Sequence, residues 1–302
     1  MTSRKISSAI MTSMIGVLAW GSFSATAMAD DAERQAAQKL LPAQYRDAGV
    51  LKVAASVVYP PHSYLKEGTT EWTGYEIDLF NAIAAVLDVK VEYVQAPFQQ
   101  LVAGVASGRS DVALGDLGDN DLRQEKVDFI DHSQITFQLS VPAGNPEHIK
   151  TVFDLCGREL GTVQGTTDVV KKALEKCESK GFPAPKFIAF PDETSRYQAQ
   201  QSGRIPQTSD QQTDTARYFK KNGIFKELDY VAAPEFGNLY IGYIVNKGNA
   251  GLSNALLAGL EVLIRDGTYA KILAKWDASD NALKNAGINI GSEATNWKQP
   301  RV

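Results

Sequence analysis

The chain has 302 residues, of which 44% are hydrophobic and 22% are charged. These values are those of an ordinary globular protein, and the length allows one large domain or two lobes with cores of their own. The formal net charge is −4 and no stretch holds a dense cluster of lysine and arginine, so a nucleic-acid partner is not expected.

The first 29 residues have the pattern of a secretory signal peptide. Arg4 and Lys5 precede an apolar run, and small residues with an A-x-A site follow it at Ala27–Ala29. A membrane anchor is the alternative, but the apolar run is short and is interrupted by Ser, Thr and Gly. Cleavage after Ala29 removes two basic residues and no acidic one, which changes the net charge from −4 to −6.

Cys156 and Cys177 are the two cysteines of the chain. Neither follows the cleavage point, so a lipid anchor is not expected, and we expect a soluble protein of the periplasm. Because that compartment is oxidising, a Cys156–Cys177 disulfide is predicted, with two buried free thiols as the alternative. The three histidines are not at ligand spacing from these cysteines, so no zinc site and no cofactor are expected.

The first half of the mature chain predicts a β-α-β-α-β order after a polar helical lead-in at residues 30–48. Apolar residues repeat at helical spacing in the longer helix, and Gly108 ends the shorter one. This order is typical of a mostly parallel α/β sheet. The elements are strands at 49–57, 90–96 and 110–114 and helices at 74–89 and 98–108.

The pattern restarts after residue 146. Strands are predicted at 158–165, 186–190 and 239–248, and helices at 166–181, 192–203 and, with a break at Gly267, 251–277. The polar tail after Trp276 is expected to wrap the surface or fray.

Two similar α/β sets in one chain predict two lobes. The chain passes to the second set near residues 132–146 and returns near 230–240, and two crossings make a hinge beside a cleft. We therefore expect lobe one at 49–135 plus 237–277, lobe two at 136–236, and a tail at 278–302.

Arg123 is the first candidate ligand-binding residue. If Asp119 or Asn120 caps a helix, Arg123 falls in the first turn, where a cation opposes the helix dipole. That placement becomes favourable if a carboxylate binds the guanidinium and the free N–H groups together. The alternative is a surface ion pair of Arg123 with Asp119 or Asp121, which contributes little.

Further candidates lie where strands end. Thr166 and Thr167 open a helix after a strand and a glycine, which suits an anion or an ordinary N-cap. Tyr59 and Phe98 follow strands at the carboxyl edge of the sheet, where open α/β folds bind ligands. Packing of either ring in the core is the alternative reading.

A family resemblance rests on motifs in a specific order. These are VVYPPHSY, GYEIDLFNAIAAVL, VEYVQAPFQQLVAGVASGRSDVALGD, DLCGRELGTVQGTT and IRDGTYAKILAKW, between about residues 49 and 277. In order and spacing the chain resembles the family 3 solute-binding proteins, which serve polar amino-acid importers of the ABC class. The resemblance implies an α/β, two-lobed fold of the type II periplasmic-binding-protein kind, with two hinge strands and closure on the ligand.

The resemblance also implies roles for individual residues. Arg123 matches the arginine that binds the α-carboxylate of the ligand, with Gly118 and Thr167 as helpers. Tyr59 and Phe98 match the rings that enclose the ligand side chain. The two cysteines match a bridge found in a subset of the family.

Two departures from the family pattern concern the ligand. Asp116 stands where many relatives have a small hydroxyl residue, and it either faces a cationic group of the ligand or is a loop carboxylate bonded to backbone N–H groups. Asp210 is the candidate for the α-ammonium, with Gln211 and Asp214 as alternatives because the segment is polar and contains a proline. Ser56 stands where relatives that take lysine or arginine have an acid, which argues against a plain basic amino acid.

The function that follows is that of a periplasmic solute-binding protein without catalytic activity. We expect a monomer that captures a small zwitterion such as an amino acid and delivers it to an inner-membrane ABC permease with its ATPase. The ligand would bind to lobe one first, and closure of lobe two would then bring Thr166, Thr167 and Asp210 into contact with it. The alternatives are a sensory domain for a receptor and a periplasmic dehydratase of the cyclohexadienyl type, with Asp210 or Glu193 as general acid.

Overall fold

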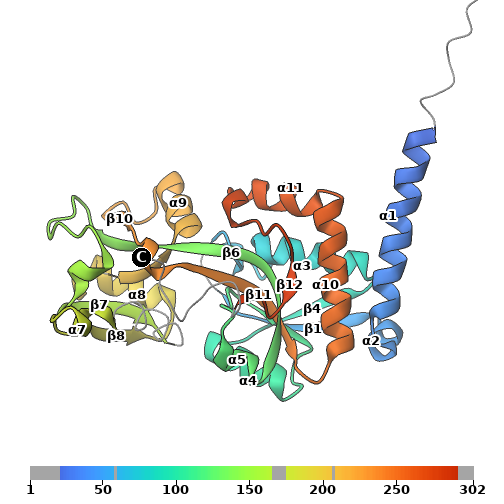
Figure 1. Cartoon of the computed structure of the whole chain (residues 1–302), viewed down its shortest axis with the longest axis horizontal. Coiled ribbons are helices and arrows are strands. Elements are labelled where there is room, and N and C mark those ends of the chain that lie inside the picture. The colour runs from blue at the N-terminus through green and yellow to red at the C-terminus, as the bar shows by residue number, and fades with distance from the viewer. Residues whose placement is uncertain (1–20, 58–59, 165–174, 206–207, 292–302) are drawn as a thin grey trace, which may run out of the picture.

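A single mixed sheet of ten strands runs through the whole molecule. The structure is a computed structural model that describes residues 21–57, 60–164, 175–205 and 208–291 (Figure 1). The α/β class and the two-lobed arrangement expected from the sequence are confirmed. The main strand order is β4 (Lys90–Gln95), β1 (Val50–Ala55), β5 (Val112–Leu114), β11 (Asn238–Asn246), β6 (Val127–Pro142), β9 (Thr208–Gln212), β7 (Glu159–Val163) and β8 (Lys186–Phe190).

The first lobe is built on the parallel strands β4, β1 and β5, with β11 antiparallel to β5. The α3 residues Ile77, Phe80 and Ile83 repeat at helical spacing and are fully buried. Gly259 lets α10 approach α3 closely, since a Cβ there would lie 3.0 Å from Ile83 Cγ2. The other elements of this lobe are the hairpin β2 (Tyr64–Leu65) and β3 (Trp72–Thr73) and the helices α3 (Tyr75–Val86), α4 (Leu101–Ala106), α10 (Ala250–Arg265) and α11 (Thr268–Lys275).

The second lobe is built on β7, which pairs in parallel with β8 and β9. The predicted Cys156–Cys177 disulfide is confirmed, and its sulfurs are 2.03 Å apart. It joins the chain just before β7 to the short helix α7 that follows. The remaining elements of this lobe are η2 (Val152–Leu155), α7 (Lys176–Ser179), α8 (Glu193–Gln201), α9 (Thr213–Asn222), β10 (Leu228–Ala232), which pairs with β6, and η3 (Pro234–Phe236).

Two long strands, β6 and β11, connect the lobes (Figure 1). They pair antiparallel from Asn238 opposite Thr136 to Asn246 opposite Val127, with an irregularity between Ile241 and Gly242. At Gly242 a Cβ would lie 2.9 Å from the carbonyl oxygen of Ile130, so the strands approach each other as only glycine allows. The chain therefore crosses between the lobes twice, as the sequence predicted.

The N-terminal helix α1 (Gly21–Leu40) leads into α2 (Ala43–Ala48) and packs on the flank of the first lobe (Figure 1). Arg34 pairs with Asp266 at 2.9 Å, and Glu33 pairs with Arg265 at 2.8 Å, so α1 is bound to the end of α10. The helix α1 covers residues 30–40 of the predicted helical lead-in and begins earlier, at Gly21. In the described part of the chain, no helix has the length and apolar character needed to cross a membrane.

The segment after Trp276 is more ordered than the sequence suggested. It forms η4 (Ser279–Asn281) and β12 (Gly287–Ile288), and β12 pairs with β6 opposite Asp131. The backbone N–H of Ile290 donates to Asp131, and that of Gly291 donates to Asp119. Residues 278–291 therefore do not fray, because β12 pairs with β6 and buried carboxylates accept N–H groups of this segment. Residues 292–302 lie outside the described chain.

Candidate functional site

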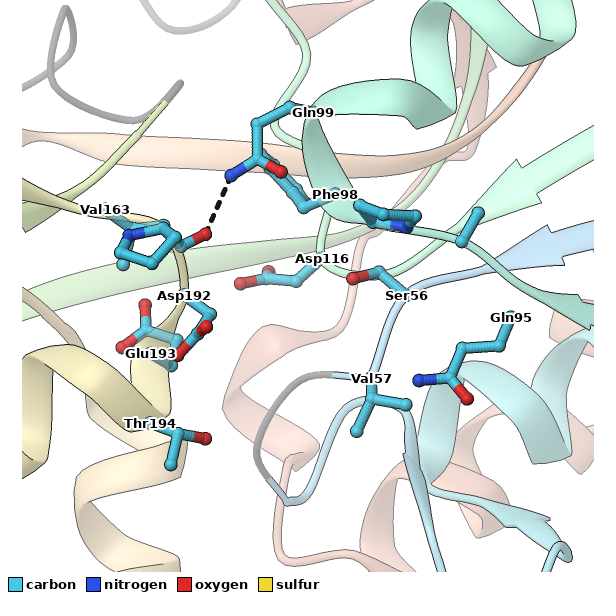
Figure 2. A pocket seen from close by; sticks show the side chains of 13 residues that line it. Ser56, Val57, Gln95, Phe98, Gln99, Asp116, Val163, Asp192, Glu193 and Thr194 are labelled. Carbon is cyan, nitrogen blue, oxygen red and sulfur yellow. Dashed lines mark hydrogen bonds between the residues drawn. The ribbon is translucent and has the colours of Figure 1, made fainter.

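A cavity of about 680 Å³ lies between the two lobes. Figure 2 shows Asp116 and Ser56 between the side chains at the start of α8 on one side and Gln95 on the other. Its walls come from both lobes, which makes it the candidate ligand site. The lining residues are Ser56, Val57, Gln95, Ala96, Pro97, Phe98, Gln99, Asp116, Val163, Pro191, Asp192, Glu193 and Thr194.

The wall from the first lobe consists of residues that follow the carboxyl ends of three parallel strands. Ser56 follows β1, Gln95 ends β4, and Asp116 comes two residues after β5. Loops at this edge converge on one place, which is why such an edge holds ligands in open α/β folds. Gly115 has a φ of 135°, and a Cβ there would lie 2.8 Å from Ser56 Cβ, so glycine lets the loops after β1 and β5 meet.

The wall from the second lobe is the start of α8 together with the end of β7. Asp192 is the N-cap of α8 and accepts hydrogen bonds from the backbone N–H and the hydroxyl of Ser195, at 2.7 and 2.8 Å. Glu193 pairs with the buried Arg196 one turn further on. The polar helix predicted at 192–203 thus presents two carboxylates at its first turn to the cavity.

Among the residues that the structure describes, two hydrogen bonds join the lobes beside this cavity. Gln99 donates from Nε2 to the carbonyl oxygen of Pro191 at 2.7 Å, as the dashed line in Figure 2 shows. Gln212, at the end of β9, donates from Nε2 to Asp116 Oδ2. The two lobes are therefore in contact both at Gln99 and at the Asp116 carboxylate.

Asp116 occupies an unusual place in the cavity wall. Its φ is 59°, its backbone N–H donates to both carboxylate oxygens of Glu76 at 3.0 and 3.2 Å, and its side chain is 19% exposed. Within the described chain, Oδ1 has no hydrogen-bond partner. Burial, with the charges of Glu76 and Asp214, raises the pKa of Asp116 to about 7 although His62 opposes this rise. Among the described residues, the carboxylate accepts a hydrogen bond from the Gln212 side chain and none from a backbone N–H, which the loop-carboxylate alternative would require.

His62 lies next to Asp116 and is only 2% exposed. Its Nδ1 is 2.8 Å from the Tyr75 hydroxyl and 3.7 Å from Asp116 Oδ1, and its Nε2 is 3.4 Å from Asp214 Oδ1. Burial disfavours the charged imidazole, but the carboxylates of Asp214 and Asp116 outweigh it and raise the pKa of His62 to about 10. His62 is therefore an imidazolium cation between a carboxylate of each lobe.

Asp214 belongs to the first turn of α9 and is buried. Burial alone would raise the pKa of Asp214, but the positive charge of His62, whose Nε2 is 3.4 Å from Oδ1, lowers it. Its Oδ2 accepts from Asn281 Nδ2 at 2.6 Å, and its Oδ1 accepts from the backbone N–H of Thr215 at 2.8 Å. Asp214, an alternative to Asp210 in the sequence analysis, thus binds His62 and Asn281 and is not among the cavity-lining residues.

Arg123 lies in the short helix α5 (Asp121–Gln124), and its guanidinium carbon is 5.4 Å from the centre of the Phe98 ring. Of the two caps left open by the sequence, Asn120 is the cap, and its side chain accepts from the backbone N–H of Arg123 at 2.9 Å. Arg123 Nη1 donates to the carbonyl oxygen of Gly118 at 2.6 Å. The structure therefore brings Arg123, Gly118 and Phe98 together, with Phe98 in the cavity wall at the start of η1 (Phe98–Gln100) and Arg123 adjoining it.

Gly118 is buried between α5 and the hinge. It pairs with Ile241 of β11, and a Cβ on it would lie 2.6 Å from Leu239 Cδ2. A larger residue would push this loop away from the crossing strand.

Four predicted ligand-binding residues cannot be compared with this geometry. Tyr59, Thr166 and Thr167 lie outside the described residues, and Asp210 is described only as part of the β9 backbone. Their roles stay predictions.

Several polar residues of the site were not singled out from the sequence. His62 counted only as a histidine without ligand spacing, and Glu76, Tyr75 and Gln212 were not considered. One sequence feature could have pointed to Tyr75 and Glu76: they follow Gly74 at the start of the predicted helix at 74–89, where polar side chains can face a site. A carboxylate in an otherwise apolar helix start faces either solvent or a buried partner, and the sequence does not distinguish these.

The match to a protein family decides what kind of protein this is. Residues 51–279 match the model of the bacterial extracellular solute-binding proteins, family 3. The chain belongs to this family. The resemblance noted in the sequence is thereby confirmed, and this solute-binding protein has its cavity between two lobes, as a protein that traps a ligand requires.

Curated relatives of this solute-binding protein are named for amino acids. A probable histidine-binding protein of Neisseria gonorrhoeae is 28% identical over 236 residues, which cover 76% of this chain and 84% of that protein. An L-cystine-binding protein of Bacillus subtilis is 26% identical over 239 residues, covering 79% and 85%.

Solved structures similar to this chain are also amino-acid-binding proteins. An ancestral arginine-binding protein bound to arginine is 29% identical, with a TM-score of 0.64 over 76% of this chain and 98% of that one. An ancestral amino acid-binding protein, a precursor of cyclohexadienyl dehydratase, is 26% identical, with a TM-score of 0.65 over 77% and 97%.

Proposed function

We propose that this solute-binding protein captures an amino acid or an amino-acid-like zwitterion and delivers it to an ABC permease of the inner membrane. The observation that carries the proposal is the cavity of about 680 Å³, which has polar side chains from both lobes among its lining residues and a size in the range of small-molecule sites. The names of the relatives, which refer to histidine, cystine and arginine, support the ligand class.

The proposed ligand contacts follow the charges around the cavity. Arg123 would bind the ligand carboxylate beside Gly118, and Phe98 would pack against the ligand side chain. Asp116 would bind a cationic group of the ligand, because Oδ1 is buried and has no hydrogen-bond partner in the described chain. Tyr59 is proposed as the second ring.

The second lobe would complete the site on closure. Thr166 and Thr167 are proposed to bind the ligand carboxylate, and Asp210 to bind the α-ammonium. Contacts made only in the closed form shift the balance between the open and closed forms.

Location and lobe boundaries are part of the same proposal. Family members are extracellular, and the signal-peptide pattern supports export with cleavage after Ala29. We propose a periplasmic monomer with lobe one at 49–135 plus 237–277 and lobe two at 136–236.

The test is a thermal-shift screen of amino acids, opines and betaines on refolded, ligand-stripped protein. A ligand at about 100 times its Kd adds roughly 2.7 kcal/mol of stability, which such a screen detects. Arg123→Ala is expected to abolish the shift for every carboxylate ligand, since the guanidinium supplies two charge-assisted hydrogen bonds. The exposed Arg109 lies outside the cavity wall, so Arg109→Ala is the matched control and should keep the full shift.

Three outcomes would contradict parts of this proposal. No shift with any zwitterion would reject the ligand class. An undiminished shift in Arg123→Ala would remove Arg123 from the site. Turnover of prephenate by the wild-type protein would establish a dehydratase in place of a binding protein.

A further inference from the structure

The backbone around His62 is built to hold this residue against the first lobe. The backbone N–H groups of Tyr75 and Glu76, at the start of α3, donate to the carbonyl oxygens of Pro61 and His62 at 2.8 and 3.2 Å. Gly74 allows this contact, because a Cβ there would lie 1.9 Å from the His62 carbonyl oxygen. The imidazole therefore has a fixed position, with the Tyr75 hydroxyl on Nδ1.

The groups that face this imidazole come from three elements. Glu76 and Tyr75 belong to α3, Asp116 to the loop after β5, and Asp214 to α9 of the second lobe. The side chains of Glu76 and Asp214 are 0% and 1% exposed, and that of Asp116 is 19% exposed. His132 of β6 lies 3.4 Å from Glu76 in the same cluster, so three carboxyl groups stand against two imidazoles in a poorly solvated place, which favours a cation or a proton at Asp116.

We propose that His62 is a positioning residue of the cavity: it lies between Asp116 of the first lobe and Asp214 of the second, and its charge controls the exchange of a proton on Asp116 for a cationic group of the ligand. This inference rests on the proposed function, because it assumes a ligand with a cationic group. The proton leaves the Asp116 carboxyl group for solvent, and the ligand cation takes its place beside the carboxylate. The positive charge of the ligand therefore replaces that of the proton. Binding of the ligand releases one proton whenever Asp116 is protonated in the ligand-free protein.

The charges around Asp116 determine the direction of the effect of His62. Burial raises the pKa of Asp116, Glu76 and Asp214 raise it further, and the positive charge of His62 lowers it, with a result of about 7. Removal of the His62 charge therefore raises this pKa, so Asp116 is protonated over a wider pH range and competes less well for a cation. The affinity for a cationic ligand is expected to fall as pH falls through the pKa of Asp116, by at most about tenfold per pH unit for one proton.

Calorimetry of the full mature protein measures the proton directly. L-arginine is the probe and L-glutamine the control. Neither changes charge between about pH 5.5 and about pH 7.5, and only L-arginine has a second cationic group besides the α-ammonium assigned to Asp210. Titrations of L-arginine in buffers of different ionisation enthalpy are expected to give close to one proton released near the lower pH. Near the upper limit they are expected to give a smaller fraction, with a higher affinity.

Three variants separate the role of His62 from a merely structural one. Asp116→Asn is expected to abolish proton release. His62→Gln keeps a donor towards Asp214 without the positive charge, and it should move the midpoint of the pH profile of affinity to higher pH. His148→Asn is the matched control, because His148 is exposed and its φ of 53° suits asparagine, and it should leave the profile unchanged.

A pH-independent affinity over this range, or an unmoved midpoint in His62→Gln, would overturn the inference while leaving the proposed function intact. If neither amino acid binds, an NMR titration of the ligand-free protein decides whether His62 has the charge that the inference requires. An imidazole of His62 that stays charged above about pH 9 supports it, and a neutral one near pH 7.5 overturns it.

Discussion

Two glycines of the first lobe, Gly74 and Gly104, differ in whether the surrounding structure has room for a side chain. Gly74 has a φ of 124° and touches the His62 carbonyl oxygen, so its lack of a side chain is what allows α3 to start beside His62. Gly104 is also a glycine of the first lobe, but it lies inside α4 and a Cβ on it would meet nothing within 4 Å. The same substitution at these two positions should therefore have opposite effects.

Gly74→Ala is expected to lower the free energy of unfolding by at least about 2 kcal/mol, since an L-residue is strained at this φ and the new Cβ clashes with backbone. Gly104→Ala is expected to be neutral or stabilising by up to about 1 kcal/mol, because alanine loses less entropy in a helix. Urea unfolding of both variants checks this pair. An equal loss in both would mean that the contact between Gly74 and His62 is not tight.

At the scale of elements, local sequence patterns predicted some helices and strands of the structure and missed others. The main strands and helices of the first half and the break at Gly267 followed from spacing and turn residues, and Asn120 was one of the two caps left open. The elements β9, α9 and β10 of the second half were not predicted. Neither was the strand β12, because two residues in a polar tail carry no periodicity and pair only through the neighbouring strand β6.

The disulfide is the element-scale feature with the clearest energetic consequence. It closes a loop of sequence separation 21 that contains β7. Reduction, or the double variant Cys156→Ser with Cys177→Ser, is expected to lower the free energy of unfolding by roughly 3 kcal/mol through the greater entropy of the unfolded chain. Denaturant curves with and without reductant measure this. A midpoint that does not move under complete reduction would contradict it.

The whole molecule brings together residues that no local pattern connects. His62 and Asp214 are far apart in the sequence and belong to different lobes, and they meet only because β6 and β11 set the lobes side by side. The sequence therefore predicted a cleft and candidates such as Arg123, Phe98 and Asp116, but not the buried charges behind Asp116. His62 and Glu76 meet Asp116 within the first lobe through contacts between distant segments, and Asp214 meets His62 only through the arrangement of the two lobes.

The contacts between α9 and the first lobe allow a test at this scale. Asp214 is buried with His62, whereas Lys221 pairs with Asp277 at 3.1 Å on the surface. A buried partner is costly to remove and an exposed pair contributes little. Asp214→Asn is therefore expected to favour the open form and increase the radius of gyration of the ligand-free protein in small-angle X-ray scattering. Lys221→Ala, the matched control, should leave that radius unchanged, and equal radii in both variants would contradict the role of Asp214.

The pairing of β12 with β6 provides a fixed attachment point for measuring the movement of one lobe relative to the other. The segment before β12 is attached to the first lobe, so exposed Lys284 offers a stationary reference mark. Phe182, which is 55% exposed and follows α7, belongs to the second lobe and moves with it. A donor and an acceptor dye at these two places would turn each capture event into a change in energy transfer, and the protein into a fluorescent sensor for its own cargo.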